Sequence, residues 1–416
     1  MSSPVHAFDI LPEMTIWWDR QSAAATLSSH LVNHFFHDTA RRLVWSDDHW
    51  NPWRTHIWPL SEQSPLLRLC LITIATAHIA AVSDKELDHK VHRASREASL
   101  RALTHSMNSG LMFGESYLTE PLTEEHCTEV MAAIVAVCYG DFFTKHSRER
   151  ALHLRACRAA VDTGLLLQRR TGLLNGTLRF LIHEANDIEA TANVFSFQDY
   201  KNLPSPSVLG KEEPFWAFTD VIHGVTAAER CLHTAHKSRR FSGTMDVGDW
   251  ISKLDSAKSR MVDKYFSDRD YLRWCERHPA FWKLVNLNYL ASLIYIFQAL
   301  SSTSTDEPRL HLAVSSLLEN IQALTHDLEF FESFAHGLYW PAFIAGTVSR
   351  SNATSQSTVT SVFMQAISKG GLWCNHDALQ FLQSFWSETA DNQYDNCNWL
   401  DYARQRQLGA LSFIVY

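Results

Sequence analysis

The chain has few cysteines, and none of them lies close to another. No two of its eight cysteines fall within four residues of each other in the 416-residue sequence. Structural zinc sites need cysteine or histidine pairs at that short spacing. We therefore expect no structural zinc site. Several of the cysteines stand in apolar, helix-like surroundings, where a free thiol behaves as a small hydrophobe.

Glycine is also sparse, with 15 residues. No expected strand leads through a glycine-rich turn into a helix, so P-loop, dinucleotide-binding and serine-elbow motifs are not found. This pattern disfavours the common cofactor-dependent enzymes, and we expect no cofactor.

Basic residues do not gather into an arm or a stripe. The formal net charge is −8, and the longest local basic group is the short run Lys237–Arg240. Proteins that hold duplex DNA neutralise phosphates with a basic face. Direct nucleic-acid binding is therefore not expected.

The N-terminus has no basic region followed by an apolar run, so it does not read as a signal peptide. The longest apolar stretch, Pro65–Val82, contains Arg68, His78 and two threonines. It is better explained as a buried helix than as a membrane span. We expect no membrane contact and a reducing compartment, either the cytoplasm or the nucleus.

Helical periodicity dominates the chain, and few alternating patterns suggest strands. We predict an all-α fold, a single large array of stacked antiparallel helices, with residues 1–25 as an N-terminal extension and 26–416 as one domain. Ser64-Pro65 is a good helix start. Expected helices cover 26–43, 65–82, 85–107, 124–143, 149–167, 178–195, 215–237 and 284–300. Expected connectors cover 108–123, 198–214, 301–308 and 349–357, and 238–279 is the hardest region to assign.

Aromatic residues are abundant, with 14 Trp and 23 Phe. Such side chains bury large areas, so they predict a large core. The alternative is an aromatic-lined, ligand-binding pocket.

Three motifs carry a resemblance. They are Trp53-Arg54 with the helix start at Ser64–Leu67, the stretch His153–Arg158, and Trp340–Gly346. Together they resemble the fungal-specific transcription factor domain family of the second type, the helical regulatory body of fungal zinc-cluster transcription factors. The resemblance implies an all-helical regulatory domain in the nucleus, tied to metabolic pathways. The six-cysteine DNA-reading module of that family has no counterpart in these 416 residues.

Some side chains in these motifs are candidates for ligand contact. Trp53 and Arg54 could cap a cavity by stacking and by a guanidinium, or could lock a loop onto the core. His153 and Arg155 lie on one expected helix with Arg158, and an arginine pair can bind a carboxylate or phosphate. Arg158 could instead pair with Asp162, four residues later.

Two further candidates are His183 and Asp187, in a run of polar residues that interrupts an apolar helix. A buried carboxylate there would have a raised pKa and could act as an acid or a base. An exposed helix face explains the same pattern more simply. Trp340 is the last candidate. His30, His34 and His37 share one helix face, but packing explains them more simply than a metal does.

The favoured function is a transcriptional regulator of a fungal pathway, expected in secondary metabolism. It would act through protein partners, either a zinc-cluster transcription factor or a second copy, or through a small-molecule effector. It would reside in the nucleus, or be shared with the cytoplasm. The alternative is a cofactor-independent enzyme, a cyclase or isomerase, on the same scaffold.

Overall fold

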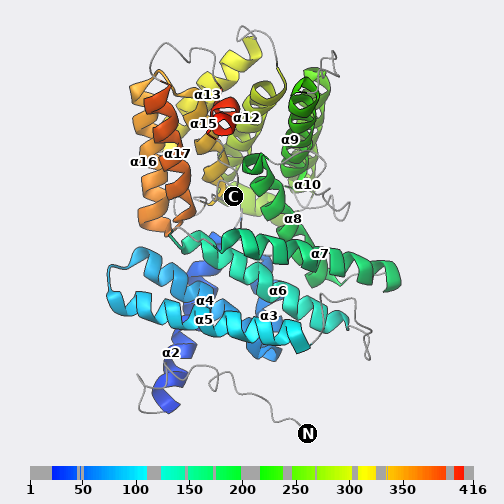
Figure 1. The fold of residues 1–416 in the computed structure, drawn as a ribbon, viewed down its shortest axis with the longest axis vertical. Coiled ribbons are helices and arrows are strands. Elements are labelled where there is room, and N and C mark those ends of the chain that lie inside the picture. The colour runs from blue at the N-terminus through cyan, green and yellow to red at the C-terminus, as the bar shows by residue number, and fades with distance from the viewer. Residues whose placement is uncertain are drawn as a thin grey trace. The chain divides into compact units, whose positions relative to one another are not determined.

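The computed structural model describes residues 21–44, 47, 51–109, 123–145, 149–171, 175–197, 216–237, 246–267, 269–301, 308–324, 334, 336–389 and 398–406. These residues form helices joined by turns, and no strand occurs among them (Figure 1). The predicted all-α class is confirmed. Most of each connector expected over 108–123, 198–214 and 301–308 lies outside the described residues.

The chain divides into two compact units. Unit 1 comprises Met1–Asn186 and Gly371–Trp373, and unit 2 comprises Asp187–Gly370 and Cys374–Tyr416. The division falls within one helix, α8 (Gly176–Ser196). The expectation of a single domain over 26–416 stays a prediction, as does the extension over 1–25. Helix α2 begins at Gln21.

Unit 1 is built around α4 and α6. Helix α4 packs against α5 and α6, and α6 packs against α7 (Figure 1). The elements are α2 (Gln21–His34), the π-helical turn η1 (Phe35–Thr39), η2 (Ala40–Arg42), η3 (Trp53–Ile57), α3 (Trp58–Gln63), α4 (Pro65–Val82), α5 (Glu86–Ser109), α6 (Glu124–Gly140), η4 (Asp141–Phe143), α7 (Arg150–Thr171) and the first part of α8.

Helix α4 begins where the sequence predicts. The Ser64 hydroxyl accepts a hydrogen bond from the backbone N–H of Leu67 at 3.0 Å, and Pro65 occupies the first turn. Such a cap satisfies one of the amide groups left open at a helix start. The threonines inside this apolar helix pair with serines of α5, since Thr73 lies 2.7 Å from Ser99. Small paired hydroxyls let two buried helices approach without an unsatisfied polar group.

A short late segment completes unit 1. Gly371 has a φ of +68°, which L residues with a side chain rarely adopt. An added Cβ there would also lie 3.0 Å from the Ala81 side chain. The tight turn brings in Trp373, whose indole N–H donates to the Ala81 carbonyl at 3.1 Å. The end of α4 is thereby covered by residues almost 300 positions later in the chain.

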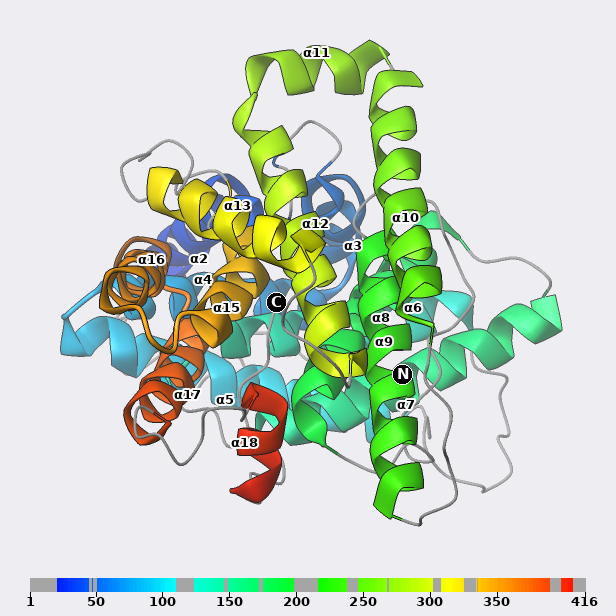
Figure 2. The same ribbon diagram turned by 90° about the horizontal axis from the view of Figure 1, so that it is seen from above.

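Unit 2 surrounds α12 (Ala280–Leu300), which is apolar on nearly all sides. It packs against α9, α10, α13 and α15, and Figure 2 shows α11 crossing between α10 and α12. The other elements are α9 (Trp216–Lys237), α10 (Val247–Ser267), α11 (Arg269–Arg277), α13 (Pro308–Leu324), η6 (His336–Leu338), α15 (Tyr339–Val348), α16 (Ala353–Gly370), α17 (Cys374–Glu388) and α18 (Trp399–Gln405).

Two expectations about elements need correction. The connector predicted over 349–357 is wrong, because α16 begins at Ala353. The Asn352 side chain accepts from the Ser355 backbone N–H, and this cap turns a polar run into a first helical turn. The helix predicted over 26–43 is not regular, because the backbone widens into a π-turn over Phe35–Thr39.

Three described helices are long and apolar enough to cross a membrane by length and composition alone. They are α4, α12 and the stretch Glu124–Phe143, and between 61% and 83% of these segments is buried within the fold. Their apolar surface is largely used in packing against neighbouring helices, as predicted for Pro65–Val82.

Candidate functional site

Trp53 and Arg54 join the loop before α3 to the core of unit 1. The Arg54 guanidinium donates to both carboxylate oxygens of Asp47, at 2.6 and 3.2 Å, and to the Phe36 carbonyl at 2.9 Å. The Trp53 indole is fully buried, with the Tyr139 ring 4.9 Å away. A bidentate pair and a buried ring of this kind hold a loop in place. These contacts match the loop-locking alternative, while a ligand-capping role stays untested.

His153 is half of an acid–base pair. Its Nδ1 donates to a carboxylate oxygen of Asp141 at 2.6 Å, and Asp141 is almost fully buried. Arg96 of α5 lies 3.7 Å from the other oxygen and 3.4 Å from Glu149. A buried carboxylate is tolerated only when cations and hydrogen bonds compensate it. The cluster therefore ties α5, η4 and α7 together around Asp141.

The two arginines near His153 do not join it. Arg155 is exposed on the outer face of α7. Arg158 lies 3.5 Å from Asp162, as the alternative interpretation predicts. The three residues of the His153–Arg158 motif thus have separate surroundings, and they do not form one anion-binding pair.

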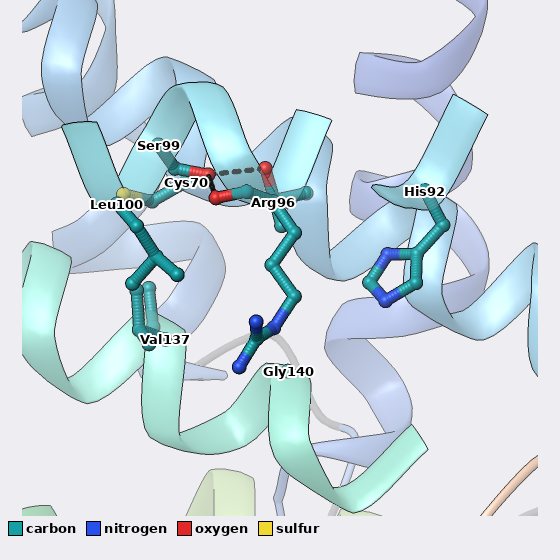
Figure 3. Close-up of a pocket in the computed structure, with 9 residues that line it drawn as sticks. Cys70, His92, Arg96, Ser99, Leu100, Val137 and Gly140 are labelled. Carbon is teal, nitrogen blue, oxygen red and sulfur yellow. Dashed lines mark hydrogen bonds between the residues drawn. The ribbon is translucent and has the colours of Figure 1, made fainter. Parts of the chain in front are cut away.

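A small pocket lies beside this cluster, between α4, α5 and α6. Figure 3 shows the Arg96 side chain reaching from α5 toward α6 near Gly140, with His92 one turn away on α5. The pocket leaves about 10 Å³ for the centre of a water molecule, which is room for about one water. Burial, followed by the charge of Arg96, lowers the pKa of His92 to about 4. This ring is therefore neutral at physiological pH.

The polar run of α8 does not form the expected exposed face, since its side chains are half-buried or buried. His183 and Asn186 are both almost fully buried. Glu184, next to His183, accepts a hydrogen bond from the Tyr139 hydroxyl in unit 1. Polar side chains can occupy a packed helix face when they have such partners. The sequence pattern alone does not reveal these partners, because they come from another helix.

Asp187 is half-buried by its exposed area, and its carboxyl group shows the effect of desolvation. Desolvation raises its pKa to about 6, although a hydrogen bond from Thr219 of α9 acts in the opposite direction. A carboxyl group in this range can give or take a proton near neutral pH. Trp340 lies elsewhere in unit 2, where its ring meets Tyr295 edge-on at 5.2 Å. Within each unit, the contacts given above do not join one of these candidates to another.

Sequence reasoning missed a histidine pair in unit 1. His34 Nε2 lies 3.1 Å from His78 Nδ1, and the Thr39 hydroxyl lies 3.2 Å from the same nitrogen. Burial lowers the pKa of His78 to about 2, so the ring is neutral and carries one ring N–H. His30 and His37 are exposed. Among the described residues, no group of three or more His, Cys, Asp or Glu side chains is placed to hold a metal ion.

Sequence reasoning also missed a buried charge cluster in unit 2. Glu229 accepts hydrogen bonds from Arg230, its neighbour on α9, and from Arg404 of α18. Arg230 also donates to the Val194 carbonyl at 2.9 Å. Both guanidinium groups lie over the ring of Phe197, which has a φ of +44°. This cluster holds the last described helix against the middle of unit 2.

The comparison with known families decides what kind of protein carries these features. The sequence profile described as the fungal specific transcription factor domain matches residues 30–185 and 235–413, which is well over half of the chain. The chain belongs to this family. No match was found among curated proteins or among solved structures.

The fungal specific transcription factor domain spans residues from both compact units. The motifs that suggested the family occupy structural positions in the fold. Trp53-Arg54 locks a loop, His153 compensates Asp141, and the Trp340–Gly346 stretch forms most of α15. Family membership indicates a transcriptional regulator.

Proposed function

We propose that the chain is a nuclear regulator of transcription for a fungal metabolic pathway, in secondary metabolism. The observation that carries the proposal is the match of the fungal specific transcription factor domain to both compact units. In this proposal the helical body acts through protein partners, either a zinc-cluster transcription factor or a second copy of the chain, and responds to a small-molecule effector.

The composition of the chain supports indirect action on DNA. The formal charge is −8, and the cysteines within these 416 residues lack zinc-cluster spacing. A chain with this charge does not attract phosphates by itself. A partner that reads DNA would supply that contact, and the helical body would supply regulation.

The alternative, a cofactor-independent cyclase or isomerase, would need a base and a pocket that holds its substrate. The His153–Asp141 pair at 2.6 Å has the arrangement of a base held by a carboxylate. However, the pocket beside Arg96 has room for about one water, which is far smaller than an organic substrate. The buried charges of unit 1 are better explained as links between helices.

A tethering experiment tests the proposal. The full chain is fused to an unrelated DNA-binding module in a fungal host that carries a reporter gene, and its location is imaged through a fluorescent tag. We expect nuclear fluorescence and a several-fold change in reporter transcript relative to the module alone. Leu287→Asp is the unfolded control, because Leu287 is fully buried in α12 and a charge there disrupts the core. An unchanged reporter with a folded, nuclear fusion would overturn the proposal.

A further inference from the structure

An aromatic chamber in unit 2 is filled by a side chain of the protein itself. The indole of Trp399, on α18, is about 1% exposed. Rings from three other helices surround it, with centroids 5.7 Å away at Phe195, 5.2 Å at Phe343 and 6.3 Å at Phe381. Tyr295 of α12 adds a fourth ring at 6.4 Å. Edge and tilted contacts at these distances favour a flat aromatic occupant.

The chamber also holds a hydrogen-bond acceptor for a ring N–H. The Trp399 indole N–H donates to Gln298 Oε1 at 3.0 Å. The Thr347 hydroxyl donates to the Ile344 carbonyl, so its oxygen must accept from Gln298 Nε2, 2.9 Å away. This fixes the Gln298 amide with its oxygen toward the indole. By contrast, the buried indole nitrogens of Trp53 and Trp340 have no hydrogen-bond partner among the described residues.

The helix that carries Trp399 is short, and it also buries Leu400, Tyr402 and Ala403. Helix α18 has seven residues, too few to be stable without its packing. Its polar anchors are Asn398, which donates to the Gln298 carbonyl, and Arg404, which donates to Glu229. If Arg404 leaves, Glu229 keeps Arg230 as its partner, and the buried pair is neutral. Release of α18 therefore strands no buried charge, which is the main penalty for opening such a contact.

We propose that this chamber is a binding site for flat aromatic ligands with a ring N–H, the indole class, and that Trp399 is the internal occupant that such a ligand replaces. The assignment names the effector class of the proposed regulator and so rests on the proposed function. The claim that the chamber binds such ligands is tested on the purified chain alone. Exchange of one indole for another keeps the ring contacts and the hydrogen bond to Gln298, so it costs mainly the undocking of α18.

The first test empties the chamber in the full chain. In Trp399→Ala, added indole raises the melting temperature in a dose-dependent way and binds in calorimetry, because ligands that bind only the folded state stabilise it. Indole binds roughly 2- to 10-fold tighter than indene, the equivalent ring without an N–H, because of the Gln298 acceptor. The matched control is Trp53→Ala, which removes the same volume without such an acceptor, and there indole and indene bind equally. Equal binding of both rings to Trp399→Ala, or no binding, overturns the proposal.

The second test uses the unaltered chain and does not depend on a cavity variant. Indole at millimolar concentration increases hydrogen exchange of the amides in 398–406, since it replaces Trp399 and releases α18. Arg404→Met weakens docking and so lowers the indole concentration needed for half of this effect by several-fold. If hydrogen exchange in 398–406 does not change at saturating indole, the claim that indole displaces Trp399 is overturned. If indole binds and the tethered reporter is active but does not respond to it, the site is not regulatory and the proposed function survives.

Discussion

The buried charge cluster of unit 2 predicts which of two substitutions lowers the stability of that unit more. Glu229→Gln keeps the shape of the side chain but removes the anion that two guanidiniums share, whose side chains are 3% exposed at Arg230 and 15% exposed at Arg404. Removing one partner from a buried ion pair costs about 3–5 kcal/mol, because the other charge is left uncompensated. We expect a loss of this size in the free energy of opening unit 2.

Arg404→Met is the matched variant, because it leaves the neutral Glu229–Arg230 pair in place. It removes one hydrogen bond between charged groups, worth about 1.5–3 kcal/mol, while the methionine keeps part of the packing over Phe197. The glutamate variant should therefore lose clearly more stability than the arginine variant.

Native-state hydrogen exchange of α9 and α18 amides measures both losses. It reports the opening of unit 2 by itself, which a single unfolding curve does not do for a chain with two compact units. Equal losses in the two variants, or a loss below about 1 kcal/mol for Glu229→Gln, would refute the view that Glu229 is the compensating centre.

Three further predictions concern unit 1. The free energy of unfolding should fall by about 2 kcal/mol through His78 alone as the pH drops from 7 to 5, because the pKa of this ring is about 2 in the folded chain and about 6.5 in the unfolded chain. Denaturation curves at both pH values should show a smaller drop in the His78→Phe variant. Gly371→Ala should lower the free energy of unfolding by at least about 1–2 kcal/mol in urea denaturation, because the backbone there has a φ of +68°. Gly140→Ala, which has open space at its Cβ, should be neutral or slightly stabilising. Equal losses in the two variants would contradict this expectation. Ser64→Ala should cost about 1 kcal/mol and raise hydrogen exchange at Leu67, and unchanged exchange there would argue against the cap.

Local chemistry explains which parts of the fold the sequence could predict. The start of α4 at Ser64-Pro65 was predictable because the cap and the proline act on their own first turn. The π-turn after His34 was not predictable, because it is accompanied by contacts to His78, 44 positions away. The start of helix α16 was not predicted for another reason. Its first turns are rich in Ser and Thr, which resemble a linker unless the Asn352 cap is recognised.

The candidate site was predictable only in part, since its residues have partners far along the chain. His153 stood out through its motif, but its partner Asp141 follows a different helix and gives no separate signal. The raised pKa of Asp187 was one of two interpretations of the polar run on α8, and the exposed face was the simpler one; its partner Thr219 gave no signal. Trp399 had one usable signal, the capping Asn398 directly before it, which marks a helix start. The rings around Trp399 come from four separate helices, and only the folded chain brings them together.

The most direct test of the central claim is a time course of all transcripts after rapid depletion of this protein in its source organism, with metabolites measured in parallel. We expect a defined set of pathway transcripts to rise or fall first, and the metabolites to follow. Steady transcripts together with accumulation of one intermediate would contradict it, and would identify the chain as an enzyme acting on that intermediate.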